Sequence, residues 1–553
     1  METNIESNLV EEIGEAKYIM SKKKEIFRKQ IRTKKHNELF HKKRFELLNF
    51  DKSSSKEPID QMMSSENAMN SVLQEIIINQ KSRINDQYQM HQQEQLANLS
   101  LYYWHLQDYL DKICSDIKNQ YLRNEVDSPD LSKNIKILKL YTSKIDEYPH
   151  IATFVLDNKI IQTLQQILTF PSLNIKNLQL DTAQIISNLT YSDADNIEKI
   201  LENNLSLIDI LVQVLKDQDN QYSTHAIYSL ANMSQEYLDV RDEALKRGVS
   251  ECIIEKYKQN KANKAFIEQL IWFIAIFSVG PHPYELIRCF VPILDEQLGL
   301  QSQSQENIKY ITFALKNLSQ GDEDKIQQIL SMKNIKKLLQ LSSKGLDKVP
   351  QNIYQIITNL TFGNSDQIML FTDFFQQLIN LEVLEHLSYG FEKISKNIKI
   401  EVCQSINNLM CSSYQAIEHI LNHRYLLSKI LAYIQTGNFI YKKELILAFG
   451  NFCINGTSAQ INFMRQRGLF SILMDSFQYE DPEITLSTLE GIYRLLELGK
   501  EFQKSQQNYN GNQVLLAFEN LGLSNCLMNL QKDPNESIYE KCEQIILNFY
   551  DYQ

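Results

Sequence analysis

One side chain returns along this chain in a constant setting: an asparagine near the end of an apolar stretch, with four copies in the pattern Asn-x-Ser/Thr. Successive copies are 42 to 49 residues apart, except for one interval of 85 residues, which is two periods and whose missing middle member falls at Ile276. A primary amide carries both a donor and an acceptor, so a row of amides can pair with the backbone of an extended peptide. A second interpretation stays open, in which each amide satisfies a carbonyl group of its own loop. The recurring residues are Asn188, Asn232, Asn317, Asn359, Asn408 and Asn451.

The elements that carry these asparagines repeat with the same period. In each unit an apolar segment ends at the asparagine and a short polar loop follows. An amphipathic segment such as residues 325–330 and a second apolar segment such as residues 335–342 complete the unit. The apolar spacing is that of a helix rather than of a strand. A period of about 40–47 residues is typical of armadillo or HEAT repeats, which stack because one unit cannot bury its apolar face alone.

The bulk composition favours the same architecture. The chain has 553 residues, 43% of them hydrophobic, and its 16 Gly and 10 Pro leave little turn chemistry for a large β protein. The longest apolar run, residues 270–279, is about half of the ~20 residues that span a bilayer, so we expect a buried helix and no membrane insertion. Eight scattered cysteines predict reduced thiols. Since no signal-peptide pattern is present, we expect the Asn-x-Ser/Thr sites to be unglycosylated.

The sequence lacks the common motifs of catalysis. It contains no phosphate-binding loop, no His-Glu-x-x-His pair and no Gly-x-Ser-x-Gly motif, and its ten histidines show no metal-ligand spacing. We therefore expect no enzyme activity, no cofactor and no metal site.

Charge is distributed unevenly along the chain. Residues 21–45 contain eight lysines and three arginines against two glutamates, a net charge of +9, whereas the whole chain carries −11. A basic arm on an acidic body predicts an acidic partner for the arm and basic peptides for the body, and it argues against a body that binds nucleic acid.

Several stretches of the chain are similar to repeats of one family. The longest are QYSTHAIYSLANMSQEYLDVRDEALKRG at 221–248 and YKKELILAFGNFCINGTSAQINFMRQRGL at 441–469, which resemble the third and eighth armadillo repeats of importin-α. The resemblance keeps phase over about residues 130–553. It implies an all-α fold, a right-handed superhelical solenoid of about ten armadillo repeats. Shorter matches, to the seventh, ninth and last repeats, are 415–424, 488–500 and 536–550.

The basic arm resembles the importin-β-binding domain of the same family. Its sequence KKKEIFRKQIRTKKHNELFHKKRF has a basic cluster, then basic residues at i, i+4 and i+7 on one helical face, then a Lys-Lys-Arg end. The resemblance implies that the arm binds importin-β or folds back onto the cargo site, where its Lys-Lys-Arg end imitates cargo. The residues concerned are Lys22, Lys23, Lys24, Arg28, Arg32, Lys34, Lys35, Lys42, Lys43 and Arg44.

The resemblance also implies a function. Importin-α is a nuclear import adaptor that shuttles between cytoplasm and nucleus: its concave groove holds a lysine-rich localisation signal, and its last repeats engage an export receptor. Asparagines bond the peptide backbone, aromatic residues one turn earlier form slots for lysine stems, and carboxylates pair with the ammonium groups. The matching residues here are Asn188, Tyr228, Asn232, Glu236, Trp272, Phe313, Asn317, Asn359, Asn408, Glu444 and Asn451.

These residues form a series along the repeats, here called the ladder, and its aromatic members depart from the family. Trp272 is the one tryptophan at these positions, and its asparagine partner is replaced by Ile276. An acid expected before the next aromatic falls on Tyr310, and Gln404 and Leu447 replace both tryptophans of the smaller, C-terminal cargo site. Since each lost slot costs about 0.5–2 kcal/mol of lysine binding, we expect an altered or narrowed cargo preference.

The domain order follows from these features. Residues 46–98 are rich in Ser, Gln, Asn and Met and are expected to be a flexible linker. Residues 99–117 read as an added helix with Trp104 in the core. The predicted order is a disordered N-terminus (1–20), the importin-β-binding basic helix (21–45), the linker (46–98), an extra helical segment (99–130) and the armadillo repeat domain (131–553).

Two other functions fit parts of the sequence. An armadillo scaffold for protein–protein interactions outside import would share the repeats but not the importin-β-binding arm. RNA binding through the arm would instead give steeply salt-dependent binding to any polyanion.

Overall fold

The computed structural model describes residues 90–202, 206–321, 323–344, 348–362, 371–505 and 512–550. Within these ranges the chain is built from helices and their connections, without a β-strand. Residues 102–553 form one compact unit. The predicted N-terminal region, the basic arm and most of the predicted linker lie outside the described residues.

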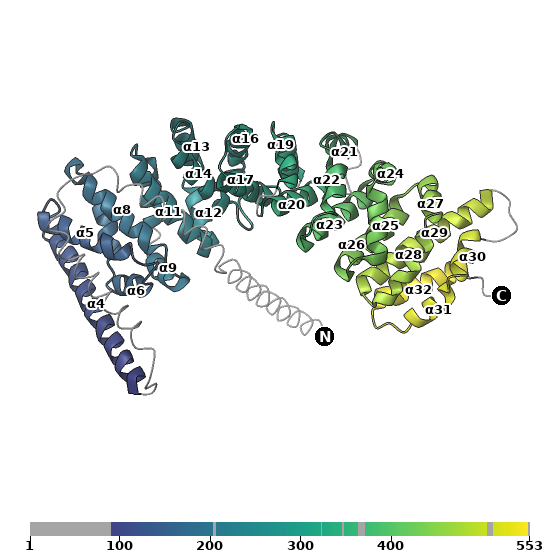
Figure 1. Ribbon diagram of the computed structural model, residues 1–553, viewed down its shortest axis with the longest axis horizontal. Helices are drawn as coiled ribbons and strands as arrows, with labels where there is room; N and C mark the ends of the chain where they lie inside the picture. Colours follow the sequence, from purple (N-terminus) through teal and green to yellow (C-terminus); the bar gives the residue numbers. More distant parts are fainter. Residues whose placement is uncertain are drawn as a thin grey trace, which may run out of the picture. The chain divides into compact units, whose positions relative to one another are not determined.

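Ten helices, here called the central row, recur along this unit and pack each on the next in chain order. In Figure 1 the labels of the row can be followed through the colours from blue to yellow. The row therefore carries the period that the recurring asparagines predicted, and the prediction of an all-α solenoid is confirmed. The row helices are α5 (Pro129–Thr142), α8 (Lys176–Leu189), α11 (Asn220–Glu236), α14 (Lys264–Phe277), α17 (Gln305–Leu318), α20 (Val349–Thr361), α23 (Lys396–Ser412), α26 (Phe439–Asn455), α29 (Pro482–Ser505) and α32 (Glu536–Phe549).

Two shorter helices follow each row helix up to α29, so nine three-helix units precede α32. Short 3₁₀ helices η2 (Leu173–Ile175), η3 (Arg288–Phe290), η4 (Leu341–Ser343) and η5 (Phe477–Tyr479) link some of them. The shorter helices are α6 (His150–Asp157), α7 (Ile161–Leu168), α9 (Ala194–Leu201), α10 (Ser206–Lys216), α12 (Leu238–Lys246), α13 (Val249–Gln259), α15 (Tyr284–Ile287), α16 (Val291–Gly299), α18 (Glu323–Leu330), α19 (Ile335–Gln340), α21 (Phe371–Asn380), α22 (Val383–Gly390), α24 (Tyr414–Asn422), α25 (Leu426–Thr436), α27 (Ser458–Arg465), α28 (Leu469–Ser476), α30 (Gln513–Glu519) and α31 (Leu523–Leu530).

Local sequence signals explain where these helices begin. Side chains of Asp219, Ser304 and Asn438 accept a backbone N–H at the starts of α11, α17 and α26. In several units the joint between the two shorter helices takes a left-handed residue, as at Gly468 with φ +90° before α28. A side chain at that φ costs about 1 kcal/mol, so glycine is favoured there.

The apolar run at residues 270–279 lies mostly within α14, and its side chains on that helix are buried. This agrees with the prediction of a buried helix. Among the described helices, none is both long and apolar enough to cross a membrane. The eight cysteines, which all fall within the described residues, are free thiols.

The added helix differs from its prediction. The helix α4 (Met90–Leu122) begins within the predicted linker and extends beyond residue 117. The prediction that Trp104 lies in the core is wrong, because its side chain is 60% exposed. Among the α4 side chains that the structure describes, the first buried one is Leu106, about 200° around the helix from Trp104. The buried face of the helix is Leu106, Leu110, Ile113, Cys114 and Ile117.

Candidate functional site

The six recurring asparagines all lie near the C-terminal ends of row helices. In α11, for example, Asn232 lies one turn before the last residue, and in α17 Asn317 is the last but one. The helices carrying them are α8, α11, α17, α20, α23 and α26. Because each row helix packs on the next, the asparagines form a series along the unit.

Each amide donates a hydrogen bond to the preceding unit. The Nδ2 of Asn359 lies 2.9 Å from Ser319 Oγ, that of Asn408 lies 3.4 Å from Thr361 Oγ1, and that of Asn232 lies 3.4 Å from Thr190 Oγ1. These three hydroxyls are the last residues of the preceding Asn-x-Ser/Thr patterns. The pattern thus supplies both halves of a contact between repeats, which we call the asparagine–hydroxyl clasp.

Two further clasps use a hydroxyl that stands in the Ser/Thr position of the pattern, although the residue two places earlier is not an asparagine. Asn188 donates to Thr142 Oγ1 over 3.3 Å, and Asn317 donates to Ser278 Oγ over 3.2 Å. In all five clasps the hydroxyl also donates to the carbonyl three residues earlier, as Ser278 does to Ala275. The hydroxyl is therefore both a donor and an acceptor. The clasp uses amide N–H groups and leaves the amide oxygen for another role.

The series has one gap, at Ile276 on α14. The hydroxyl that an asparagine there would reach belongs to Ser234 on α11, which is 2% exposed. Among the described residues, Ser234 Oγ has no hydrogen-bond partner. A buried hydroxyl without a partner is unfavourable, so this joint lacks the polar contact of its neighbours.

The series also changes character between α23 and α26. The register that holds a hydroxyl elsewhere is Met410 after Asn408, which offers no side-chain oxygen. Asn451 instead donates to Asn407 Oδ1 over 2.8 Å. Asn407, a neighbour of the predicted Asn408, was not predicted as a site residue, although the Asn-Asn pair marks the position.

Aromatic rings and carboxylates gather on α11, α14 and α17. The rings of Tyr228 and Trp272 meet edge to face with centroids 5.4 Å apart. Burial raises the pKa of Tyr310, and the nearby Glu306, Tyr228 and Glu268 add to the effect. Two glutamates, Glu306 and Glu268, therefore lie near Tyr310, each one turn before an aromatic residue of its helix. That i, i+4 spacing is the signal by which they could have been found.

The other predicted residues in this part are Glu236 on α11 and Phe313 on α17. Glu236 is the last residue of α11 and is half-buried. Phe313 on α17 already lies beneath a lysine of the chain: Lys316 Nζ is 4.5 Å from the ring centroid. Burial lowers the pKa of Lys316, although Glu401 nearby favours its charged form.

In the C-terminal part of the row the carboxylates are held by amides. Glu444 accepts from Gln404 Nε2 over 3.2 Å and from Asn407 Nδ2 over 3.5 Å. Glu401, which was not predicted as a site residue, accepts from the hydroxyl of Thr358 over 2.8 Å. The structure thus brings Glu444 and Asn451 together in one amide–carboxylate network.

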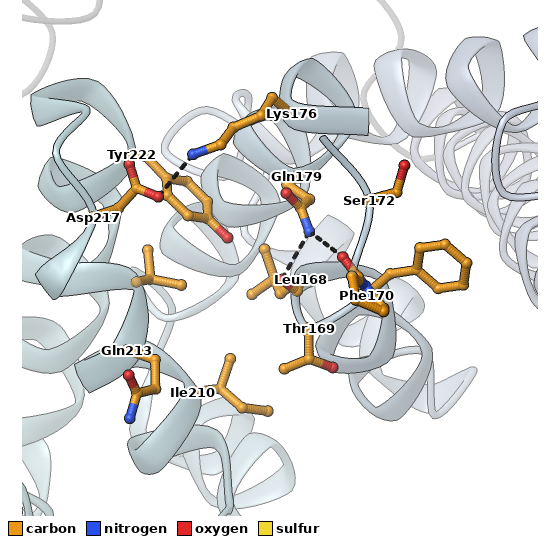
Figure 2. Close-up of a pocket in the computed structure, with 12 residues that line it drawn as sticks. Leu168, Thr169, Phe170, Ser172, Lys176, Gln179, Ile210, Gln213, Asp217 and Tyr222 are labelled. Carbon is orange, nitrogen blue, oxygen red and sulfur yellow. Dashed lines mark hydrogen bonds and ion pairs between the residues drawn. The ribbon is translucent and has the colours of Figure 1, made fainter. Parts of the chain in front are cut away.

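A separate hollow of about 460 Å³ lies beside the loop between α7 and α8 (Figure 2). Lys176 and Asp217 form an ion pair of 2.8 Å on its wall, and Gln179 donates to the carbonyl groups of Leu168 and Phe170. None of the predicted site residues lines it. Gln179 is nine residues before the asparagine of α8, about 14 Å along the helix. Among the described residues, no group of three or more His, Cys, Asp or Glu could hold a metal ion.

Comparison with known proteins finds relatives that share one name. No family model matches the chain. Importin subunit alpha-8 of Arabidopsis thaliana is 26% identical over 401 residues, which cover 71% of this chain and 85% of that protein. Importin subunit alpha-1b of Oryza sativa subsp. japonica is 24% identical over 377 residues, 68% of each chain.

A solved structure supports the fold. The crystal structure of an engineered protein aligns with a TM-score of 0.63 and 15% identity, covering 80% of this chain and 99% of that one. At that identity the likeness concerns the fold alone. In its relatives, its all-α architecture and its asparagine-bearing row, the chain is similar to the importin-α family.

Proposed function

We propose that this protein is a nuclear import adaptor, which binds a lysine-rich localisation signal along the central row and links it to importin-β. The observation that carries the proposal is the cluster on α11, α14 and α17, where Tyr228, Trp272 and Tyr310 lie with Glu268 and Glu306. Aromatic faces beside carboxylates suit a side chain with an apolar stem and a cationic head.

A lysine of the cargo would use both features of this cluster. Its methylene stem packs against the rings of Tyr228 and Trp272, and its ammonium group pairs with a carboxylate. Glu306 supports this role: its Oε1 lies 3.0 Å from Lys309, and its Oε2 is buried and, among the described residues, accepts no hydrogen bond. An ammonium group entering here would supply that missing donor.

The asparagine series would hold the peptide backbone. Each clasp engages amide N–H groups, so the amide oxygens of residues such as Asn317 and Asn359 are the groups that would accept a peptide N–H. This arrangement binds extended chains without regard to side chain, while the aromatic cluster selects lysine. The clasp also sets the orientation of the amide before a peptide arrives, which lowers the entropy cost of binding.

The basic arm would couple cargo to importin-β. Its Lys42, Lys43 and Arg44 would occupy the lysine sites when importin-β is absent and leave them when importin-β binds the arm. Competition for one segment makes the two partners' affinities depend on each other. In the same proposal the chain shuttles between cytoplasm and nucleus, its last repeats engage an export receptor, and it has no enzyme activity or cofactor.

The test is fluorescence polarisation of a labelled lysine-rich peptide with the full chain. A full-length variant with Lys42, Lys43 and Arg44 changed to alanine should bind the peptide more tightly and importin-β more weakly. In that variant, Trp272→Ala should weaken peptide binding about three- to thirtyfold. Glu306→Gln, which keeps the side-chain size, should weaken it as well.

The second tryptophan supplies the control. Trp104 lies on α4, outside the central row, and is largely exposed. Trp104→Ala should leave the peptide affinity unchanged. If the folded arm variant does not bind the peptide, the adaptor proposal fails. If, in addition, the wild-type chain does not bind importin-β, an armadillo scaffold outside import is the better account.

A further inference from the structure

We propose that the central row accepts one basic cluster of a cargo peptide, on α11 to α17, and that Lys316 closes the row beyond it to a second. This inference rests on the proposed function and narrows its substrate class to signals with a single basic cluster. Its basis is that the chain's own cation and amides already fill the positions a second cluster would need.

Lys316 occupies the place of a cargo lysine. Its Nζ lies 4.5 Å from the centroid of Phe313, the last aromatic ring of the predicted ladder. The side chain is half-buried, and its backbone carbonyl accepts from the Asn359 amide over 3.2 Å and from the Ser319 hydroxyl. The clasp between α17 and α20 therefore holds the turn that carries Lys316. A peptide cation approaching Phe313 would meet a like charge at close range.

The carboxylates beyond Lys316 already have partners. Glu401 is close enough to favour the charged form of Lys316, and its Oε2 accepts from Thr358. Glu444 has one amide on each oxygen, from Gln404 and Asn407. Glu306 differs, because its Oε2 accepts no hydrogen bond among the described residues. The carboxylate oxygen that could still accept a hydrogen bond from a cargo cation is therefore that of Glu306, on α17.

Two positions in the C-terminal part where an aromatic ring was expected hold no ring. Leu447 takes the place of an aromatic ring on α26 and is itself buried. Gln404 takes the corresponding place on α23, and its amide is directed at Glu444. Stem packing and ammonium pairing are the two terms that hold a lysine, and both are reduced here.

The experiment compares two labelled peptides on the full chain by fluorescence polarisation. One carries a single lysine-rich cluster, and the other carries the same cluster plus a second at the far end of a neutral spacer. Because the basic arm competes with both peptides alike, the ratio of their dissociation constants is the quantity to read. We expect a ratio within about twofold of one in the wild type.

Lys316→Met should change that ratio. Met keeps the stem over Phe313 but removes the charge, so the two-cluster peptide should gain about tenfold. The matched control is Lys336→Met, which removes the same charge from α19, outside the central row. We expect the ratio to stay near one in that variant.

The outcomes separate this inference from the proposed function. One outcome is that the wild type binds both peptides, with a dissociation constant about tenfold lower for the two-cluster peptide than for the single-cluster peptide. That result overturns the inference, while the adaptor function stands. If the ratio stays near one in the Lys316→Met variant, the assignment to Lys316 is overturned. If a folded chain binds neither peptide, with its arm lysines neutralised, both proposals fall.

Discussion

The asparagine–hydroxyl clasp can be tested with two serines that occupy the same register of the central row. Ser319 and Ser234 each end an Asn-x-Ser pattern, and both are buried. Ser319 takes part in a clasp, whereas Ser234 has no hydrogen-bond partner among the described residues, and Ile276 stands where its asparagine would be. Replacing each serine with alanine removes one buried hydroxyl from the same register of the row. The two variants therefore differ mainly in the clasp.

The structure gives the size of the expected difference. Ser319 Oγ accepts from Asn359 over 2.9 Å and donates to the Lys316 carbonyl over 2.9 Å. Asn359 keeps its other acceptor, the same carbonyl at 3.2 Å, so the loss is partial. We expect Ser319→Ala to lower the free energy of unfolding by about 1–2 kcal/mol. Ser234→Ala should leave it unchanged or raise it by up to about 1 kcal/mol, since a buried unpaired hydroxyl is removed.

The assay should be local, because long repeat arrays lose two-state cooperativity. Native-state hydrogen exchange of α17 and α20 reports the joint at Ser319, and that of α11 and α14 reports the joint at Ser234. Ser319→Ala should lower protection on both sides of its joint. The reasoning is refuted if Ser234→Ala lowers protection around its own joint by as much.

Three further changes test other contacts. Ile276→Asn should cost about 1 kcal/mol less with Ser234 present than in the Ser234→Ala background, because the new amide can complete the clasp; a double-mutant cycle of thermal unfolding measures this. Gly468→Ala should cost about 1 kcal/mol by urea unfolding, because the open space around the residue leaves only the left-handed backbone to oppose it. Arg241 is fully buried and donates to the carbonyl groups of Val279 and Pro281, so Arg241→Met should destabilise by about 2–4 kcal/mol in a thermal melt.

The fold could be predicted because the period is visible in the sequence. Helical apolar spacing repeats with the asparagines, and stacking is the only way to bury it. The bounds of α4 and the exposure of Trp104 were predicted less well. The sequence of a single helix outside the repeats does not tell which of its faces packs against the next helix. The buried face of α4 becomes clear only from its packing.

The candidate site could be predicted in part. The asparagines were visible, but their partners lie about 40 residues earlier in the chain, and only the stacking register pairs them. Glu306 lies one turn before Tyr310, the position where a carboxylate was expected, and Glu268 lies on the neighbouring helix α14. Lys316 is adjacent to Asn317, and nothing in its sequence context tells that its ammonium group lies over Phe313.

The clasp has a direction: the hydroxyl always belongs to the earlier repeat and the asparagine to the later one. The repeats therefore cannot be exchanged freely, since the asparagine of each repeat needs a hydroxyl in the repeat before it. The boundary between α13 and α14 lies at a joint without a clasp, because Ile276 has no side-chain amide to donate to Ser234. A chimera that exchanges segments with a relative at that boundary would cut no clasp, whereas the joints on either side of it would need both partners transplanted together.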